Sequence, residues 1–341
     1  MKLPYLTADL PGIGGTLKSR DEDFVVEEIP AYPPSGTGDH VFVRYEKRGL
    51  TTPQAVTVIA RALGVRDRDI GVAGMKDRQA VTTQWISLPP PVTPEVALAL
   101  VLDQVRVLEA VRHNHKLRTG HLRGNRFRLV VRSVTGEAAG TAAAILSRLV
   151  EPPGAPNWYG EQRFGRDGDN AQKGRALVLG ERPLGRDRKL DRLMVSSLQS
   201  ELFNHWLVAR LADGLYRSAI PGDVMHKVAG GMFDSTEPDV DGPRVAMGEI
   251  VPTGPMFGVS MRAPAPGSAA AEREATILAA SGLTLESFAT VRAIAEGTRR
   301  DAAIAITDAT VAAVEDTLEV TFALPAGAYA TAVMRELMKP E

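Results

Sequence analysis

The sequence predicts an α+β fold, because strand-like and helix-like segments follow one another without strict alternation. Of 341 residues, 44% are apolar and 24% are charged, which is typical of a globular protein and not of a disordered chain. At roughly 150 residues per domain, this length favours about two domains. The strongest boundary signal is the proline-rich segment Glu151-Pro-Pro-Gly-Ala-Pro156. No run of about 18 apolar residues occurs, so we expect no membrane span.

The first half of the chain combines short strand patterns with one clear helix. That helix begins at Thr52-Pro53, because threonine caps a helix and proline suits its first position. Apolar residues recur at helical spacing up to Leu63, and Gly64 ends the helix. Residues 74–79 form a predicted turn. The expected strands are rich in β-branched and aromatic residues and cover residues 24–30, 40–47, 70–73, 81–88, 105–111 and 127–131.

The second half contains more helix. Residues 222–258 are rich in glycine, proline and acid, which predicts hairpins and loops. A strand pattern returns at residues 318–323, followed by a turn at Leu324-Pro-Ala-Gly327. The expected helices cover residues 137–150, 190–211, 269–280, 285–295 and 329–338.

The net charge of −1 conceals a segregation of charge along the chain. Residues 112–132 contain seven Arg or Lys, three His and no acid, whereas residues 213–249 contain seven acids and three Arg or Lys. A neutral protein can therefore carry a basic face, which is the electrostatic signature of a nucleic-acid binder.

Several classes of function are excluded by missing residues. The chain has no cysteine, which removes disulfides, thiolate metal sites, iron–sulfur clusters and thiol nucleophiles. The sequence also has no P-loop, no dinucleotide-binding glycine motif, no HExxH and no GxSxG. His113 and His115 form the one close histidine pair, but no carboxylate lies nearby in sequence, so we expect no metal site. The absence of cysteine and of a secretory signal suits the cytoplasm.

The densest polar segment runs from Gly74 to Trp85 and contains Asp77 between Lys76 and Arg78. Neighbouring cations favour the ionised form of a carboxylate, and an ionised carboxylate can act as a nucleophile or a general base. The alternative is a surface turn with an ordinary ion pair. The local residues by themselves favour that alternative.

Two further segments combine charge with aromatic rings. His121-Leu-Arg-Gly-Asn-Arg-Phe127 offers cations for phosphates, a ring for stacking and an amide for a base edge. A solvated hairpin is the alternative, but the acid-free surroundings favour nucleic acid. Asn157-Trp-Tyr-Gly-Glu-Gln-Arg-Phe-Gly165 follows the proline-rich boundary and indicates either an aromatic hinge or the lining of a binding site.

Together these segments resemble the signatures of the TruD family of tRNA pseudouridine synthases. The resemblance rests on residues 73–84, 122–127 and 157–165, and it extends to residues 17–27, 38–47, 196–204 and 324–337. The motifs are collinear over almost the whole chain, except for residues 232–248, which we cannot align.

The resemblance implies a pseudouridine-synthase catalytic domain with a mixed, largely antiparallel sheet built from both chain ends. This domain is expected to comprise residues 1–154 and 305–341, with an inserted α/β TRUD domain at residues 155–304. It further implies an isomerase that converts uridine to pseudouridine in tRNA, in this family usually at position 13 of the D-arm. No protein partner is implied, and the oligomeric state stays open.

The resemblance also implies which residues carry the reaction. The family's catalytic aspartate falls on Asp77. The reaction breaks the C1′–N1 bond and joins C1′ to C5 of the same base without a redox step, so we expect no cofactor. Phe127 is the predicted stacking partner of the base, and Asn125 a predicted contact of the base or the backbone. The other residues expected to contact the RNA are carried over by motif position: Lys18, Glu27, His40, Lys76, Arg78, Glu161 and Arg163.

Two other functions compete with this one. The first is a non-catalytic RNA-binding protein or tRNA chaperone on the same fold, which has no need of an acid between cations at Asp77. The second is a glycoside hydrolase that pairs carboxylates such as Asp77 and Glu27, which would leave the basic segment unexplained.

Overall fold

The computed structural model describes residues 3–134 and 136–340. The chain forms two compact units, and each is described by itself below. Unit 1 comprises Met1–Asp9, Ser147–Ala305 and Thr331–Glu336. Unit 2 comprises Leu10–Leu146, Ile306–Ala330 and Leu337–Glu341. Each unit therefore combines segments that are far apart in sequence.

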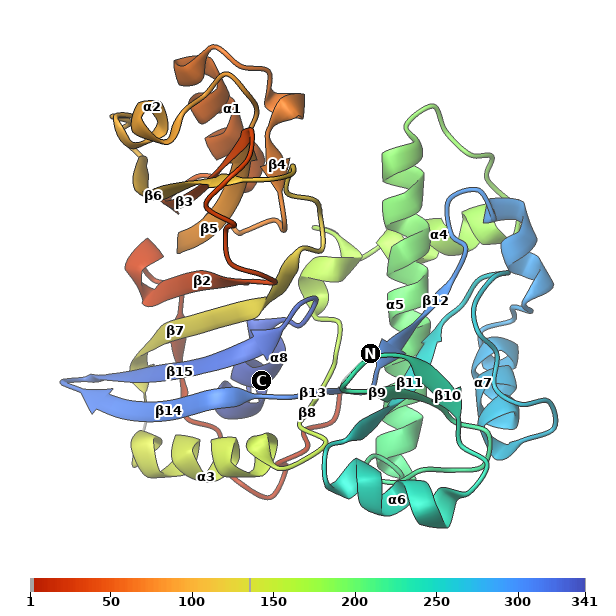
Figure 1. Cartoon of the computed structure of the whole chain (residues 1–341). Coiled ribbons are helices and arrows are strands. Elements are labelled where there is room, and N and C mark those ends of the chain that lie inside the picture. The colour runs from red at the N-terminus through yellow and green to blue at the C-terminus, as the bar shows by residue number, and fades with distance from the viewer. Residues whose placement is uncertain (1–2, 135, 341) are drawn as a thin grey trace. The chain divides into compact units, whose positions relative to one another are not determined.

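Unit 2 is built on one sheet with the strand order β14-β15-β7-β2-β5-β3-β6 (Figure 1). Neighbouring strands on this path are antiparallel except β2 and β5, and two short strands extend it, since β1 pairs with β7 and β4 with β5. The C-terminal hairpin β14–β15 continues the sheet next to β7, so the sheet contains strands from both halves of the chain. The strands are β1 (Gly14–Leu17), β2 (Phe24–Pro30), β3 (His40–Arg48), β4 (Gly71–Val72), β5 (Val81–Leu88), β6 (Val105–His113), β7 (Leu122–Val134), β14 (Thr307–Val314) and β15 (Thr317–Pro325).

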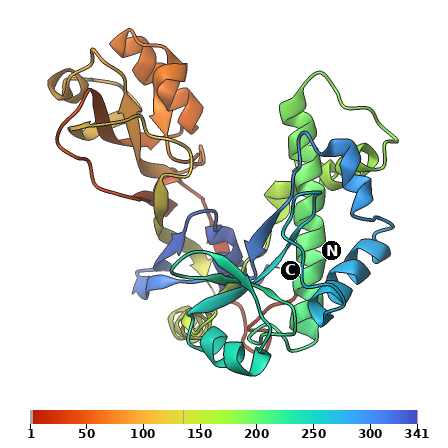
Figure 2. The ribbon, with the colours of Figure 1, turned by 45° about the vertical axis from the view of Figure 1, so that its right-hand side comes forward.

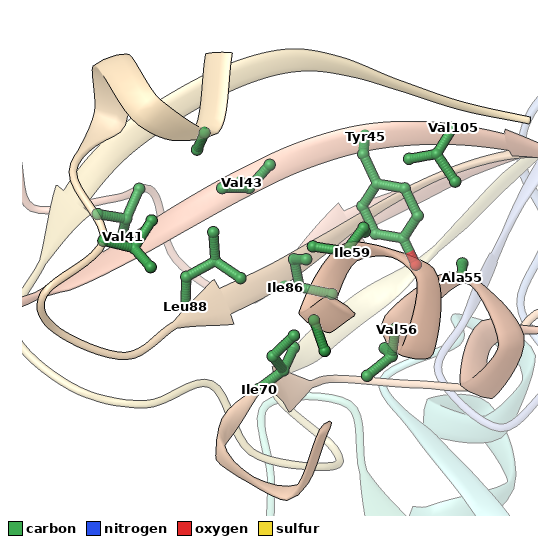
Figure 3. Packing of buried hydrophobic residues seen from close by; sticks show 13 residues of the cluster. Val41, Val43, Tyr45, Ala55, Val56, Ile59, Ile70, Ile86, Leu88 and Val105 are labelled. Carbon is green, nitrogen blue, oxygen red and sulfur yellow. The ribbon is translucent and has the colours of Figure 1, made fainter. Parts of the chain in front are cut away.

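Helix α1 (Thr52–Leu63) covers the end of the sheet formed by β3, β5 and β6. Figure 3 shows its Ile59 packed against Val43 and Ile86 of the sheet, and all three are at most 1% exposed. The helix cap is Thr51 and not the predicted Thr52, because Oγ1 of Thr51 accepts the N–H of Gln54. The other helices with residues in unit 2 are α2 (Pro94–Leu98), α3 (Ala138–Val150), α8 (Ala330–Met338) and the 3₁₀ turns η1 (Asp21–Asp23) and η2 (Asp67–Asp69).

Unit 1 is organised around α5 (Arg188–Ala212), the long green helix of Figures 1 and 2. The buried residues of α5 include Phe203 and Trp206, and Arg210 forms a buried ion pair with Asp223 at 2.6 Å. A small sheet with the order β10-β9-β11-β12 packs against this helix through β11. The remaining elements are β8 (Ala155–Pro156), η3 (Glu161–Phe164), α4 (Asn170–Val178), β9 (Val224–Lys227), β10 (Met232–Asp234), α6 (Pro238–Ala246), β11 (Ile250–Met256), α7 (Ala269–Ala280), η4 (Glu286–Val291), β12 (Thr298–Asp301) and β13 (Ala303–Ile304).

The α+β class and the mixed sheet predicted from the sequence are confirmed, and most expected elements begin and end within three residues of their predicted bounds. Three local predictions need correction. Residues 238–246 form α6 despite Gly242 and Pro243, because tertiary contacts override weak helix propensity. The helix expected at residues 285–295 is the short 3₁₀ turn η4. Strand β7 extends five residues before the predicted start at Phe127, because both of its edges are paired.

A search of the described helices finds none that is both long and apolar enough to cross a membrane.

Candidate active site

Asp77 lies on the connection between β4 and β5 in unit 2, and its side chain is 56% exposed. Hydrogen bonds hold the two residues beside it in place. Lys76 donates its backbone N–H to Oγ1 of Thr52 at 2.9 Å, and Nε of Arg78 donates to the carbonyl of Gly49 at 3.0 Å. Gly74 does not adopt a positive φ, so this connection does not depend on the conformational freedom that glycine offers. The carboxylate of Asp77 is thus presented to solvent from a segment fixed on both sides.

The side chain of Lys76 points away from solvent into the sheet. Its Nζ lies 2.6 Å from Oε2 of Glu28 on β2, and the two side chains are 5% and 1% exposed. Glu28 also accepts the backbone N–H of Trp85 through Oε1 at 3.2 Å. Each of these two buried charges compensates the other, because a buried charge without a partner costs much free energy. The pair therefore anchors the Asp77 segment to β2 and β5.

A second lysine, Lys47 of β3, holds the same segment through its backbone. It is fully buried, and its Nζ donates to the carbonyls of Leu50 at 2.6 Å and of Asp77 itself at 2.8 Å. Burial lowers the pKa of Lys47 to about 8, although the nearby charge of Asp77 opposes that decrease. The sequence analysis includes Lys47 only within the resembling segment 38–47 and assigns it no role in the site, because nothing in the strand pattern shows that its side chain is buried.

Lys18 reaches the Asp77 carboxylate directly. Its Nζ lies 2.9 Å from Oδ2 of Asp77 and 4.0 Å from the ring centroid of Phe24. Lys18 follows β1 and has a φ of 62°, a left-handed conformation that costs energy for a residue other than glycine. Such strain concentrates at functional sites, where the surrounding structure holds a side chain in place. The ammonium group of Lys18 is thereby set between a carboxylate and an aromatic ring.

Three phenylalanines share the sheet face that carries this site. Phe127 of β7 is 6% exposed, and its ring meets Phe24 edge-on at 6.3 Å and Phe322 of β15 at 5.5 Å. Asn125 lies two residues before Phe127 and therefore on the same face, and its Oδ1 is buried without a hydrogen-bond partner. An unsatisfied buried acceptor is rare and is often explained by a missing ligand or water.

The motif Leu122-Arg-Gly-Asn125 owes its glycine to close strand packing. A Cβ placed on Gly124 would lie 2.2 Å from the carbonyl oxygen of Leu324 on β15. A larger residue would push β15 away from β7. Because Asn125 and Phe322 depend on that same pairing, Gly124 keeps the polar and aromatic parts of the site in register.

Two predicted residues of unit 2 lie away from Asp77. Glu27 neighbours Glu28 on β2, so its side chain points to the opposite face of the sheet, where Arg44 and Arg126 pair with it. His40 begins β3 and is seven residues from Lys47, which corresponds to about 23 Å along an extended strand. The structure thus brings together Asp77, Lys18, Lys76 and Arg78 with the face of Asn125 and Phe127, and leaves Glu27 and His40 outside that group.

Glu161 and Arg163 belong to unit 1, on the 3₁₀ turn η3. Glu161 is exposed. The guanidinium of Arg163 donates to the hydroxyls of Ser196 and Ser200 on α5 and lies 5.5 Å from the ring centroid of Tyr159. The aromatic segment that follows the proline-rich boundary is therefore packed onto α5.

The basic segment 112–132 is less cationic in the folded chain than in the sequence. Its three arginines on the outer face of β7 pair with acids: Arg126 with Asp308 at 3.2 Å, Arg128 with Glu319 at 3.0 Å, and Arg132 with Asp23 at 2.7 Å. The hydrogen bond from Arg132 holds the pKa of Asp23 below its usual value. Acids from other elements thus neutralise three of the seven basic side chains of this segment.

The described residues contain no group of three or more His, Asp or Glu side chains that could hold a metal ion. The site offers the exposed carboxylate of Asp77. The ammonium group of Lys18 orients this carboxylate, and the ammonium group of Lys47 binds the backbone carbonyl of the same residue. Beside it lie aromatic rings and an amide oxygen without a partner. Such a carboxylate can act as a nucleophile or a general base, and aromatic rings with an amide can bind a nucleic-acid base.

Comparison with known proteins identifies relatives of the whole chain. The family model "tRNA pseudouridine synthase D (TruD)" matches residues 1–182 and 186–337. A tRNA pseudouridine synthase D of Anaeromyxobacter sp. (strain Fw109-5) is 52% identical over 98% of this chain and 96% of its own length. A protein of that name from Thermus thermophilus is 42% identical over 100% of this chain and 93% of its own length. A crystal structure from Methanosarcina mazei described as TruD superposes with a TM-score of 0.81 at 24% identity, covering 100% of this chain and 99% of the other.

Proposed function

The chain belongs to the TruD family of tRNA pseudouridine synthases, and from this premise we propose that it isomerises uridine to pseudouridine in tRNA with Asp77 as the catalytic carboxylate. The observation that carries the assignment of Asp77 is its position. Its exposed carboxylate lies 2.9 Å from the ammonium of Lys18, and that ammonium lies 4.0 Å from the ring centroid of Phe24, which contacts Phe127. Its neighbours Lys76 and Arg78 support this role by fixing the loop.

Two routes start from Asp77, and both need its carboxylate ionised. In one, an oxygen of the carboxylate attacks C1′ and the uracil leaves with the electron pair of the glycosidic bond. In the other, the carboxylate removes the 2′ proton while the uracil leaves with the electron pair of the glycosidic bond, which gives a glycal, and it returns the proton to C2′ when the new bond forms. Either route ends when C5 of the same uracil bonds to C1′, which in the first route displaces the carboxylate. C5 then loses a proton and N1 gains one, so no oxidant or reductant is consumed.

The detached uracil has to turn while it stays bound. A flat aromatic surface permits rotation about the stacking axis, and Phe127 is the proposed stacking partner within the cluster. The partnerless Oδ1 of Asn125 supports a role in accepting a hydrogen bond from the base or the backbone. Because the target base starts inside folded RNA, it has to be flipped out at a cost of a few kcal/mol, which phosphate contacts offset.

The remaining assignments follow from family membership. We propose uridine 13 of the D-arm as the target and the cytoplasm as the site of action. Residues 1–154 with 305–341 are proposed as the catalytic domain, and residues 155–304 as the inserted TRUD domain. Lys18, Lys76 and Arg78 in the first domain and Glu161 and Arg163 in the second are proposed to act on the RNA. Glu27 and His40 are weaker proposals, since they lie away from Asp77. No cofactor is part of this scheme.

The carboxylate pair that a glycoside hydrolase would need is not formed by Asp77 and Glu27. The Glu27 side chain points to the opposite sheet face and forms ion pairs with Arg44 and Arg126.

A non-catalytic RNA-binding protein remains the competing function. The test is pseudouridine mapping on an unmodified tRNA transcript by carbodiimide labelling and primer extension. A stop in the D-arm supports the proposed activity, whereas no stop across a full tRNA pool with intact binding supports the RNA binder.

We expect Phe127→Leu to lower kcat/KM roughly 5- to 150-fold, which is the loss of about 1–3 kcal/mol for one stacked base. Leucine keeps much of the buried volume, so the variant should lose less stability than the ~3–5 kcal/mol typical of Phe→Ala. Phe288→Leu is the matched control, because Phe288 is fully buried in unit 1 and its loss should affect stability alone. Steady-state kinetics and urea unfolding of both variants separate the two effects. Normal turnover by Phe127→Leu would remove the stacking role.

Lys47→Met should lower kcat at least tenfold, because about 1.5–3 kcal/mol is typical of a hydrogen bond from a charged donor. The lost bond is the one that fixes the carbonyl of Asp77. Lys116→Met is the control, since Lys116 also donates to a carbonyl, that of Arg68 at 2.7 Å, but at an exposed site. Single-turnover kinetics of both variants measure the effect on chemistry. Equal rates for the two would show that Lys47 does not position Asp77.

The lowered pKa of Lys47 also predicts a pH dependence of stability. Between about pH 8 and the unfolded value of about 10.4, the unfolded chain binds the proton on Lys47 and the folded chain does not. The free energy of unfolding of the wild type, measured relative to Lys47→Met, should therefore rise as the pH increases through 8. Urea titrations of both proteins at pH 7, 8 and 9.5 test this. A difference that stays constant or falls would contradict the buried, easily deprotonated lysine.

A further inference from the structure

The connection from α4 to α5 and the first turns of α5 carry a dense set of cations. In Figure 1 this connection passes around the end of α5 at which that helix begins. Between residues 182 and 192 there are five basic side chains and two acidic ones. The basic residues are all exposed: Arg182, Arg186, Arg188, Lys189 and Arg192.

Both acids of this segment accept hydrogen bonds from backbone N–H groups of the same segment. Oδ1 of Asp187 caps α5 by accepting the N–H groups of Lys189 at 2.9 Å and of Leu190 at 3.2 Å. Asp191 is 2% exposed and accepts the N–H of Gly185 at 2.7 Å. Neither carboxylate is therefore engaged with a basic side chain of the segment.

The cations are correspondingly unpaired. Within residues 3–134 and 136–340, no acid forms an ion pair with Arg186, Arg188, Lys189 or Arg192. This contrasts with Arg126, Arg128 and Arg132 of β7, which pair with Asp308, Glu319 and Asp23. Four exposed cations without an acidic partner in the described chain thus lie within seven residues of one another at this helix end of unit 1.

The placement of these residues works against the stability of the helix. A helix N-terminus carries a partial positive charge, and Arg188 and Lys189 occupy its first turn. Arg188 and Arg192 also lie four residues apart on one face, where like charges repel. Asp187 and Asp191 also lie at this helix end, but neither forms an ion pair with these cations, so the repulsion between the cations is expected to have a functional reason.

The cations continue into a row along α5. Arg188, Arg192, Ser196 and Ser200 are spaced four residues apart, so they follow one ridge over about 18 Å. The guanidinium of Arg163 lies on the hydroxyls of Ser196 and Ser200. Three guanidinium groups are therefore arranged along one side of the helix, although Arg163 comes from a separate segment.

We propose that this ridge, defined by Arg188, Arg192 and Arg163 with Arg186 and Lys189 beside it, is a docking surface on unit 1 for the phosphate backbone of the substrate RNA. The inference rests on the proposed function and adds a second region of RNA contact to the site around Asp77. A guanidinium presents a planar pair of donors that matches a phosphate, and four of these five cations are arginines. The positive helix end adds to the attraction for anions.

The test removes two adjacent charges and measures RNA binding against salt. In Arg188→Gln/Arg192→Gln, two phosphate contacts fewer should reduce the slope of log K against log salt by about 1.4–1.8. The ratio of variant to wild-type Kd for an unmodified tRNA transcript should then fall about tenfold between 50 and 200 mM salt. In steady-state assays KM for tRNA should rise, with kcat changed less than twofold.

Arg217→Gln/Arg292→Gln is the control for the change in net charge, since both residues are exposed in unit 1 and neither lies in the ridge, although Arg217 pairs with Glu151 at 3.2 Å. It should keep the wild-type salt slope and KM. The ridge variant should also unfold at the same or a higher urea concentration, because a repulsion has been removed, whereas a purely structural role would lower it. A salt slope and KM equal to those of the control overturn the docking surface, including the case in which the ridge binds an acidic protein. Failure of the proposed function appears separately, as wild-type protein that binds tRNA but forms no pseudouridine.

Discussion

Asp77→Asn should form no pseudouridine, a loss of at least about 10⁴-fold, while it binds tRNA as tightly as the wild type. The amide keeps the shape of the side chain and can still accept a hydrogen bond from Lys18, but it neither attacks C1′ nor removes a proton. Because the side chain is 56% exposed and the loop is held by Lys76, Lys47 and Arg78, the fold should be unaffected. The measurement is carbodiimide labelling with primer extension on one tRNA, beside a filter-binding titration.

Asp308→Asn is the matched control for this prediction. Asp308 is a similarly exposed aspartate of unit 2 that pairs with Arg126 at 3.2 Å, so the same chemical change is made away from Asp77. It should retain full activity. A primer-extension stop with Asp77→Asn would preserve the enzyme but refute the role of Asp77. Loss of tRNA binding along with activity would show that Asp77 acts in recognition.

Glu28→Gln should reduce the free energy of unfolding by about 3–5 kcal/mol, which is typical when one partner of a buried ion pair is removed. The ammonium of Lys76 would then remain in the interior without its counter-charge, and the loop that carries Asp77 would lose its anchor. The expected result is therefore a joint loss of stability and activity. Urea unfolding at pH 7 measures the first, and pseudouridine formation measures the second.

The neighbouring residue supplies the control. Glu27→Gln makes the same change one position earlier on β2, but on the opposite face and at 39% exposure, where an ion pair contributes about 0–1 kcal/mol. The double variant Glu28→Gln/Lys76→Met should be more stable than the sum of its single variants implies, because it removes the uncompensated charge. If Glu28→Gln costs no more than Glu27→Gln, the buried pair does not hold the Asp77 loop.

The positions of the strands and helices were largely predictable because their signals are local. A β-branched run bounded by turn residues defines β2 and β5, and a Thr-Thr-Pro start with a closing Gly64 defines α1 to within one residue. The failures arise where the decisive contacts are not local. Helix α6 contains Pro243 and Gly242, and its stability comes from contacts that no short window of sequence contains.

The proposed site was predictable only in part. Asp77, Lys76 and Arg78 are contiguous, so one motif contains them, and Lys18, Asn125 and Phe127 fall in other motifs of the same family. Glu28 and Phe322 were not singled out, and Lys47 was noted only as part of a family motif, because each joins the site through strand pairing between distant segments. The register of a sheet decides which residues meet, and the sequence of one strand does not contain that register.

The sequence by itself determined the α+β class, the approximate bounds of most elements, the family and the motif around Asp77, since all of these are properties of short or collinear segments. The tertiary structure decided which charges matter. It neutralised Arg126, Arg128 and Arg132 across strands and buried Lys47 and the pair of Lys76 with Glu28 beneath Asp77. It left the cations at the start of α5 exposed. The physical reason is that electrostatic energy depends on distance and burial in space, which the order of residues along the chain does not specify.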